Sequence, residues 1–208
     1  MPKMRISENE LYRIHPIPMD TVMIYQSHEI GEPFIIPLKV PSEADKFLDD
    51  HRHYTKSNIN VCYAAPRSAK GARSWYETQL NVSSSVRQRE GYPCKGVPFY
   101  VVTDDGIGFM AHTTSANNKQ FAAVGDELIL GRWIKGRLAS EGLVRPVENI
   151  ADDTGREGMI TREILDSYGC NAIAMQKTDL RIPDPMRPQN MYEVWTLKLI
   201  KSDGVDDG

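Results

Sequence analysis

Two segments of the sequence carry side chains that suit contacts with nucleic acid. The first, residues 65–75, has three cations, no acid and several small residues that let a backbone approach a phosphate closely. Its candidate contact residues are Arg67, Ser68, Lys70, Arg73 and Trp75. The second, residues 112–120, consists almost entirely of residues that can hydrogen-bond, and its candidates are Thr113, Thr114, Ser115, Asn117, Asn118, Lys119 and Gln120. Arginine suits guanine edges and asparagine or glutamine suits adenine edges, so the pair of segments favours nucleic-acid binding over two ordinary polar loops.

A third group of cations lies on a segment with helical periodicity. Apolar residues recur at positions 130, 133, 134 and 138, which predicts an amphipathic helix. We expect Arg132, Lys135 and, less well aligned, Arg137 to lie away from this apolar stripe, where they could contact phosphates. A solvated helix face without a ligand is the alternative interpretation.

The usual patterns of catalytic and metal-binding residues are missing from the sequence. No histidine has a lysine two residues later, as phospholipase D-type nucleases require, and there is no Walker loop, no GxGxxG and no HExxH. His51 and His53 could form a metal-binding pair, but a polar linker explains them better. Residues 104–106, Asp-Asp-Gly, are typical of a turn that closes two strands. We therefore expect no catalytic centre, no metal and no cofactor in this chain.

Charge is distributed unevenly along the chain. The formal net charge is −3, but residues 61–137 hold ten Lys or Arg and six Asp or Glu, a net +4, which leaves −7 for the remainder. The basic charge is thus concentrated where the candidate contact residues lie. No apolar run approaches the roughly 20 residues of a membrane span, and the N-terminus does not read as a signal peptide. The three cysteines lack zinc-ligand spacing. We expect a cytoplasmic protein with no membrane partner.

The pattern of apolar residues predicts many short strands and two short helices. The strands are expected at 21–25, 34–36, 59–63, 74–82, 98–103, 107–112, 172–177 and 192–200, and the helices at 130–138 and 160–168. Ser42 could begin a further short helix. This pattern favours a mainly β fold, a small barrel, over alternating βαβ units. We divide the chain into an N-terminal extension with short strands and a linker (1–60), the barrel (61–201) and a flexible tail (202–208).

The order of these segments resembles plant B3 domains. A basic, proline-containing loop (65–70) leads to Trp75 and Tyr76, a short helix follows Val82, and a polar loop (117–120) precedes a Gly-Trp helix (131–136). The chain is more similar to the C-terminal B3-like DNA-binding domain of phospholipase D-type restriction endonucleases, over about residues 62–200. The stretches that carry this similarity are 75–77, 103–106, 117–119 and 130–136.

The resemblance implies a seven-stranded open β-barrel with two short helices, a B3-like pseudobarrel. Two recognition arms would clamp the major groove of DNA: an N-arm at residues 65–75 and a C-arm at residues 112–120. The chain departs from the family in lacking the nuclease half and in carrying residues 1–60, which match no B3 core. The resemblance therefore implies that a separate nuclease domain or subunit cuts the DNA.

Sequence-specific binding of double-stranded DNA, as the target-recognition domain of a restriction endonuclease, is the hypothesis that these observations favour. Direct readout of bases by arm side chains would give the specificity, and phosphate contacts would fix the register. Two alternatives stay open. The chain could be a complete restriction endonuclease with an unrecognised catalytic centre, or it could be a carbohydrate- or protein-binding β-module that uses exposed Trp75 and Trp195 as stacking platforms.

Overall fold

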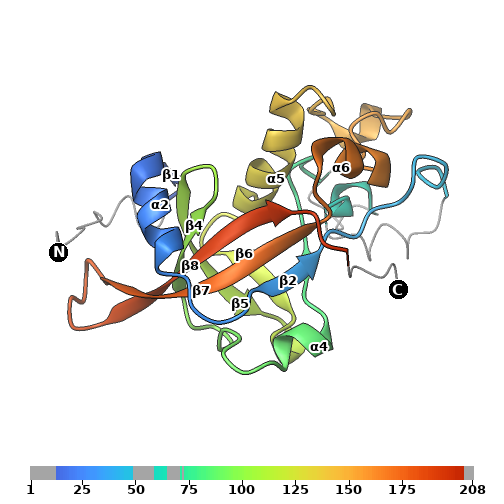
Figure 1. Ribbon diagram of the computed structural model, residues 1–208. Helices are drawn as coiled ribbons and strands as arrows, with labels where there is room; N and C mark the ends of the chain where they lie inside the picture. The colour runs from blue at the N-terminus through green and yellow to red at the C-terminus, as the bar shows by residue number, and fades with distance from the viewer. Residues whose placement is uncertain (1–12, 49–58, 65–70, 72, 204–208) are drawn as a thin grey trace. The chain divides into compact units, whose positions relative to one another are not determined.

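A computed structural model describes residues 13–48, 59–64, 71 and 73–203 (Figure 1). The strands are β1 (His15–Pro16), β2 (Phe34–Pro37), β3 (Leu80–Asn81), β4 (Phe99–Thr103), β5 (Ile107–Thr114), β6 (Gln120–Ala123), β7 (Ala172–Pro183) and β8 (Met191–Ile200). The α-helices are α2 (Met19–Ser27), α4 (Ser84–Arg87), α5 (Ile129–Ser140) and α6 (Arg162–Tyr168). Three 3-10 helices are η1 (Val61–Tyr63), η2 (Ala116–Asn118) and η3 (Ile150–Asp152). None of the helices described is long and apolar enough to cross a membrane.

The strands form one strongly curved sheet. Their order is β2-β7-β8-β4-β5-β6-β3, and β1 pairs with β5 off this path. Strand β4 runs antiparallel to β5, with Phe99 opposite Ala111, and parallel to β8, with Tyr100 opposite Val194. The chain is mostly sheet, with a nearly closed barrel of seven strands and few short helices. The predicted fold class is therefore confirmed.

Backbone contacts divide the chain into two compact units, which we describe separately. Unit 1 comprises residues 1–36, 82–126 and 173–199, and unit 2 comprises residues 37–81, 127–172 and 200–208. The domain boundary that we predicted after residue 60 is not a boundary between these two units. The segment that we expected to be an extension contributes β1, α2 and β2 to the structure, and β1 pairs with β5 through His15 and Gly108.

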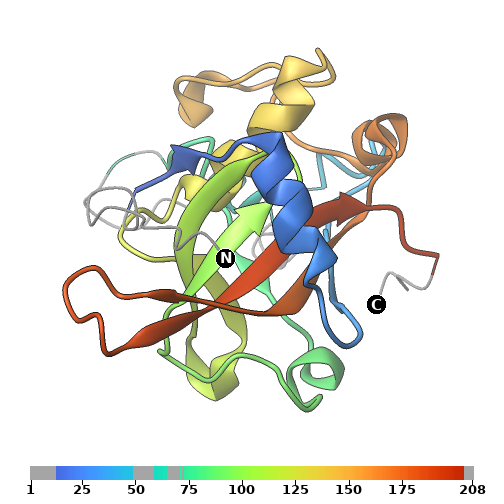
Figure 2. The same ribbon diagram turned by 60° about the vertical axis from the view of Figure 1, so that its left-hand side comes forward.

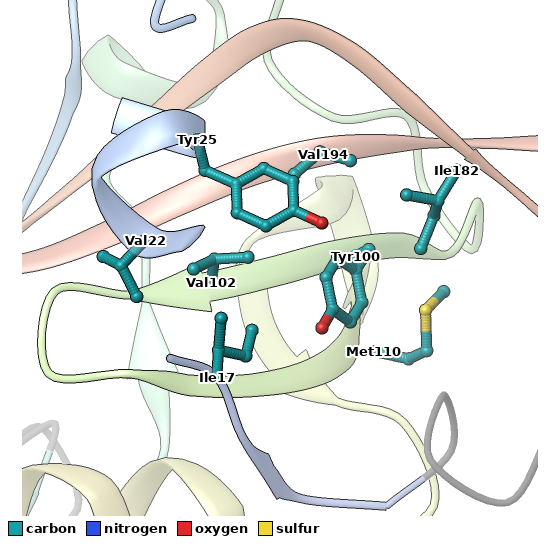
Figure 3. Close-up of a cluster of buried hydrophobic side chains, with 8 residues drawn as sticks. All are labelled: Ile17, Val22, Tyr25, Tyr100, Val102, Met110, Ile182 and Val194. Carbon is teal, nitrogen blue, oxygen red and sulfur yellow. The ribbon is translucent and has the colours of Figure 1, made fainter. Parts of the chain in front are cut away.

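The core of unit 1 forms between α2 and the sheet. Helix α2 buries Val22 and Tyr25 against Tyr100 and Val102 of β4, and Val194 of β8 joins the same cluster (Figure 3). Figure 3 shows that Ile17, Met110 and Ile182 complete it. The hydroxyl of Tyr100 hydrogen-bonds His15 Nε2 at 2.7 Å. A second aromatic group packs Phe34, Phe99, Phe121 and Trp195 together.

Two predicted strands of the N-terminal half are wrong. The β-branched run 21–25 was expected to be extended, but it lies inside helix α2, which begins after Pro18 and buries two residues spaced three apart. Residues 59–63 were also expected to be extended, but they contain η1. Asn60, just before η1, is fully buried, and its side chain donates to the Ile160 carbonyl (2.6 Å) and accepts from the Ile160 amide (3.0 Å). These long-range contacts override the local preference for a strand.

The remaining elements mostly agree with the sequence prediction. Strands β4, β5, β7 and β8 and helices α5 and α6 are confirmed, although β7 extends to Pro183. Gly169 ends α6 in the left-handed conformation (φ 84°), as expected for a residue after a helix. The expected strand 74–82 is largely wrong, because only Leu80 and Asn81 are extended in the sheet and residues 75–76 form a turn.

Candidate nucleic-acid interface

The polar segment of unit 1 forms the connection between β5 and β6. Thr114 pairs with Gln120, so residues 115–119 form a five-residue loop that contains η2. We call these residues the 115–119 loop. Three of them are non-glycine residues with positive φ: Ser115 (68°), Asn117 (55°) and Asn118 (59°). Ser115 also has ψ of 177°, a region that residues other than glycine essentially avoid, so the conformation costs of order 1–3 kcal/mol. Surrounding contacts must stabilise it.

Those contacts come from the segment that precedes β4. Arg87 donates from Nη1 to the Asn117 carbonyl at 2.8 Å, and Asn118 donates from Nδ2 to the Pro93 carbonyl at 2.6 Å. The Val82 amide donates to the Lys119 carbonyl at 2.7 Å. The loop is thus held through its backbone and through Asn118. This leaves the side chains of Asn117 and Lys119 exposed to solvent.

The predicted contact residues of this segment differ in their accessibility. Asn117 and Lys119 are exposed, and Lys119 forms no ion pair with any residue that the structure describes. Half-buried positions are occupied by Thr114, Ser115, Asn118 and Gln120. Ser115 donates from Oγ to Gln120 Oε1 at 2.8 Å, which commits both side chains to the loop itself.

Thr113 is a correction to the predicted set. Its side chain is fully buried, and Oγ1 donates to the Pro93 carbonyl at 3.2 Å, so it cannot reach a ligand from the surface. The reason is alternation along β5, because Thr113 follows Ala111 on the buried face of the strand. Burial also lowers the pKa of the neighbouring His112, which favours the neutral form of its imidazole.

The surroundings of the 115–119 loop are basic. Residues 83–97 contribute Arg87, Arg89 and Lys95 against a single acid, Glu90, and the loop itself adds Lys119. At the opposite end of the same strands the β4–β5 turn carries Asp104 and Asp105. Charge is therefore segregated along the strands of unit 1, which suits an anionic ligand at the end that carries the loop.

The described residues of the predicted N-arm, 71 and 73–75, belong to unit 2. Arg67, Ser68 and Lys70 lie outside the described residues, as do His51 and His53. Arg73 pairs with Glu77 at 2.5 Å, and their side chains are only 12% and 15% exposed. The guanidinium is therefore already engaged by a carboxylate within the protein.

Trp75 does not lie on a surface. It is 1% exposed, and its Nε1 donates to the Gly158 carbonyl at 2.7 Å. Trp195 of unit 1 is also fully buried. The prediction of Trp75 as a contact residue is thus wrong, and so is the alternative in which both tryptophans serve as stacking platforms. Both indole rings instead fill the interior of their units.

The three basic residues of α5 differ in how far they are exposed to solvent. Arg132 is exposed, as predicted. Arg137 is half-buried and donates from Nε to the Tyr168 hydroxyl at 2.8 Å. Lys135 is fully buried, so the prediction that it contacts phosphate from an exposed face is wrong.

The buried site of Lys135 follows from the close approach of α5 to the 75–76 turn. Gly131 lies so near the Tyr76 carbonyl that a Cβ at this position would overlap it. One turn later, Lys135 donates to the Trp75 carbonyl and lies 3.5 Å from Cys62 Sγ. Its Nζ also lies 5.2 Å from the centre of the Trp75 ring. Burial lowers the pKa of Lys135 and raises that of Cys62. This group, which we call the Lys135 cluster, lies in the interior of unit 2.

Sequence reasoning located the 115–119 loop but missed the residues that hold it. Arg87 and the Pro93 carbonyl were not among the predicted site residues, because their hydrogen bonds to the loop join residues that are distant in sequence. The signal that could have indicated Arg87 was a run of basic and polar residues (83–89) with no acid. In the described part of the chain no three His, Cys, Asp or Glu side chains are grouped as metal ligands would be.

A comparison with models of protein families finds a match. The family model described as the NgoFVII C-terminal B3-like DNA-binding domain matches residues 32–179, which include the 115–119 loop, residues 83–97 and helix α5. The expectation that residues 1–60 match no B3 core is therefore wrong for residues 32–60. No curated protein matches the chain.

Proposed function

The chain belongs to the family of the NgoFVII C-terminal B3-like DNA-binding domain and binds double-stranded DNA, and from this premise we propose that it is the target-recognition part of a restriction endonuclease. It would read a short site in the major groove, and a nuclease domain or subunit would cut. The observation that carries the proposal is the 115–119 loop: a strained backbone, held by three hydrogen bonds, that leaves an amide and an ammonium group exposed at a basic end of the sheet.

Asn117 is the residue best suited to read a base. A carboxamide can pair with the N6 and N7 edge of adenine through two hydrogen bonds, which fixes both the base and its orientation. The hydrogen bond from Arg87 to the Asn117 carbonyl holds the left-handed backbone from which this side chain projects. Such preorganisation lowers the entropic cost of binding.

Phosphate contacts would fix the register of the protein on the duplex. Lys119 and the exposed Arg132 carry charges that suit this role, each in its own unit. The predicted N-arm residues Arg67, Ser68 and Lys70 have the composition for further base or phosphate contacts, and they remain candidates from the sequence. Arg73 remains a weaker candidate, because its pairing with Glu77 would have to break first.

The proposal is tested by Asn117→Ala in a binding assay against a panel of single-base variants of a selected duplex. We expect a loss of about 1–3 kcal/mol on the preferred site and relaxed discrimination at one base position. Lys119→Ala is the matched control, because it removes an exposed side chain from the same loop without removing a base-reading group. Equal losses on every duplex of the panel for Asn117→Ala would contradict base readout by this residue.

A complete endonuclease remains the second candidate from the sequence. It is distinguished by incubating the purified chain with plasmid DNA and Mg²⁺: products of defined length would favour it, and intact plasmid at saturating protein would favour the recognition role.

A further inference from the structure

The hairpin formed by β7 and β8 continues beyond the matched residues of the family. The match ends at residue 179, whereas the strands run on to Pro183 and resume at Met191. Figures 1 and 2 both show this hairpin extending past the rest of the sheet of unit 1. We call residues 181–191 the hairpin tip.

The conformation of the hairpin tip is fixed by a buried carboxylate. Asp184 is 6% exposed, and its Oδ1 accepts from the amides of Met186 (2.9 Å) and Arg187 (3.3 Å). Its Oδ2 accepts from the Tyr192 hydroxyl at 2.9 Å. The Asn190 amide donates to the Arg187 carbonyl at 2.7 Å, and the tip also contains three prolines, Pro183, Pro185 and Pro188. The tip is thus a structured element rather than a loose loop.

The base of the tip is anchored in the core of unit 1. Ile182 is buried in the cluster that includes Met110 and Val194 (Figure 3), and Leu180 and Tyr192 pack against the same cluster. The tip is therefore joined through packed side chains to the sheet that carries the 115–119 loop.

The exposed charge of the hairpin tip is positive. Arg181 and Arg187 are both exposed, and neither forms an ion pair with any residue in the described part of the chain. The single acid of the tip is Asp184, whose oxygens accept hydrogen bonds. Burial alone would raise the pKa of Asp184, but hydrogen bonds from the Met186 amide, the Tyr192 hydroxyl and the Arg187 amide, together with the charge of Arg187, outweigh that effect and lower it.

Strand directions place the tip at the same end of the sheet as the 115–119 loop. Strand β8 runs parallel to β4, and β5 runs antiparallel to β4, so β8 begins where β5 ends. Residues 83–97, 115–119 and 180–191 together hold six Lys or Arg and two Asp or Glu. The tip thus adds positive charge to the basic end of unit 1, beyond the residues around the 115–119 loop.

We propose that Arg181 and Arg187 bind the phosphate backbone of the same DNA duplex, beyond the bases that the 115–119 loop reads. This inference rests on the proposed function, because it assumes that DNA lies against this end of the sheet. Two guanidinium groups on a rigid support suit phosphate oxygens, and the contact needs no particular base. The family match does not include these residues, so the contact would be an addition to the recognition loops.

The test measures how binding depends on salt and on duplex length. The full chain and the Arg181→Ala/Arg187→Ala variant are titrated with random-sequence duplexes of about one and about three helical turns, at several NaCl concentrations. Because each neutralised phosphate contributes about −0.9 to the slope of log K against log[salt], we expect the variant to have a slope shallower by about 2 on the long duplex. On the short duplex the two proteins should have the same slope.

Two controls separate this effect from others. Arg13→Ala removes an exposed arginine of unit 1 next to β1, which pairs with the start of β5 at the opposite end, and it should leave both slopes unchanged. Arg181→Lys/Arg187→Lys should restore the slope, and thermal unfolding should show that all variants fold alike. If the double alanine variant has the same salt slope on the long duplex as the unaltered chain, the inference is overturned and the proposed function stays intact. Failure of the unaltered chain to bind any duplex would overturn both.

Discussion

In the 115–119 loop, Arg87 and Asn118 form hydrogen bonds with backbone carbonyls, and the neighbouring side chains of Asn117 and Lys119 are left exposed. In the Lys135 cluster, by contrast, a lysine amine forms the same kind of bond with the Trp75 carbonyl, but every group involved is buried. Both regions satisfy carbonyls with cationic or amide donors. They differ in accessibility: side chains that can bind a ligand stay exposed in the first region, whereas the second region is a packed interior.

The comparison shows that residue type alone does not separate a binding residue from a structural one. Lys119 in the first region and Lys135 and Trp75 in the second were all predicted to be contact residues. What decides their role is whether a partner within the protein already satisfies the group. A buried cation with a carbonyl partner is costly to remove, whereas an exposed one can exchange water for phosphate.

The largest effect is expected from Lys135→Ala. Removing the amine leaves the Trp75 carbonyl without its donor and opens a cavity beside the indole ring, which should destabilise the protein by about 2–5 kcal/mol. Lys135→Met fills much of the space and should cost less, about 1–3 kcal/mol. Denaturant titration gives both values. If Lys135→Ala left stability unchanged but weakened DNA binding, the cluster would be a binding site after all.

Arg87→Ala should affect binding more than stability. The guanidinium bonds the Asn117 carbonyl in a strained loop, and a hydrogen bond to a charged group contributes about 1.5–3 kcal/mol. The loop should then sample other conformations, and DNA affinity should fall by about tenfold or more. Arg87→Lys can still reach the carbonyl and should recover part of the loss. The check is a comparison of affinity with the unfolding midpoint; a fall in stability alone would mean that Arg87 has no role in positioning the loop.

A smaller loss of stability, about 1 kcal/mol, is expected from Asp153→Asn in unit 2. The pH dependence of this loss tests the hydrogen bonds of Asp153. Burial would raise the pKa of Asp153, but hydrogen bonds from Tyr63 Oη (2.5 Å) and from the amides of Gly158 and Glu157 outweigh this and lower it. A lowered pKa in the folded state contributes stability that is present above the unfolded-state pKa of about 4 and is lost as pH falls through the folded-state pKa.

The unaltered chain should therefore lose stability below about pH 4 more steeply than the variant. Unfolding midpoints measured from neutral to acidic pH test this, with Asp105→Asn in unit 1 as the reference. Parallel pH profiles for the unaltered chain and Asp153→Asn would contradict the assignment.

The smallest change is expected from Lys119→Ala. Loss of one exposed cation should weaken binding evenly across sequences and reduce the magnitude of the salt slope by about 1. Stability should not change, because the side chain is exposed. A measurable loss of stability would show that Lys119, like Lys135, has a structural role.

Much of the fold could be predicted because local pattern and tertiary structure agree. The apolar runs of β4, β5 and β8 and the apolar stripe of α5 point to the elements that form. Helix α2 could not be predicted in this way, because its run of β-branched residues favours a strand and only packing of Val22 and Tyr25 on the sheet selects a helix. The turn at 75–76 depends on the approach of Gly131, which lies far away in the sequence.

The candidate site was predictable in position but not in detail. Hydrogen-bonding residues between two strands indicated a loop with a binding function. Which of these side chains face solvent depends on two features of the folded chain. One is the face of β5 on which Thr113 lies, and the other is the hydrogen bond from Arg87 to the Asn117 carbonyl.

The central claim is that the 115–119 loop reads bases in double-stranded DNA. The most direct test is selection of bound duplexes from a random pool at physiological salt, carried out in parallel with the unaltered chain and with Asn117→Ala. We expect the first selection to converge on a short motif and the second to give the same motif with one position degenerate. Identical motifs from both proteins, or no enrichment by the unaltered chain, would contradict the account.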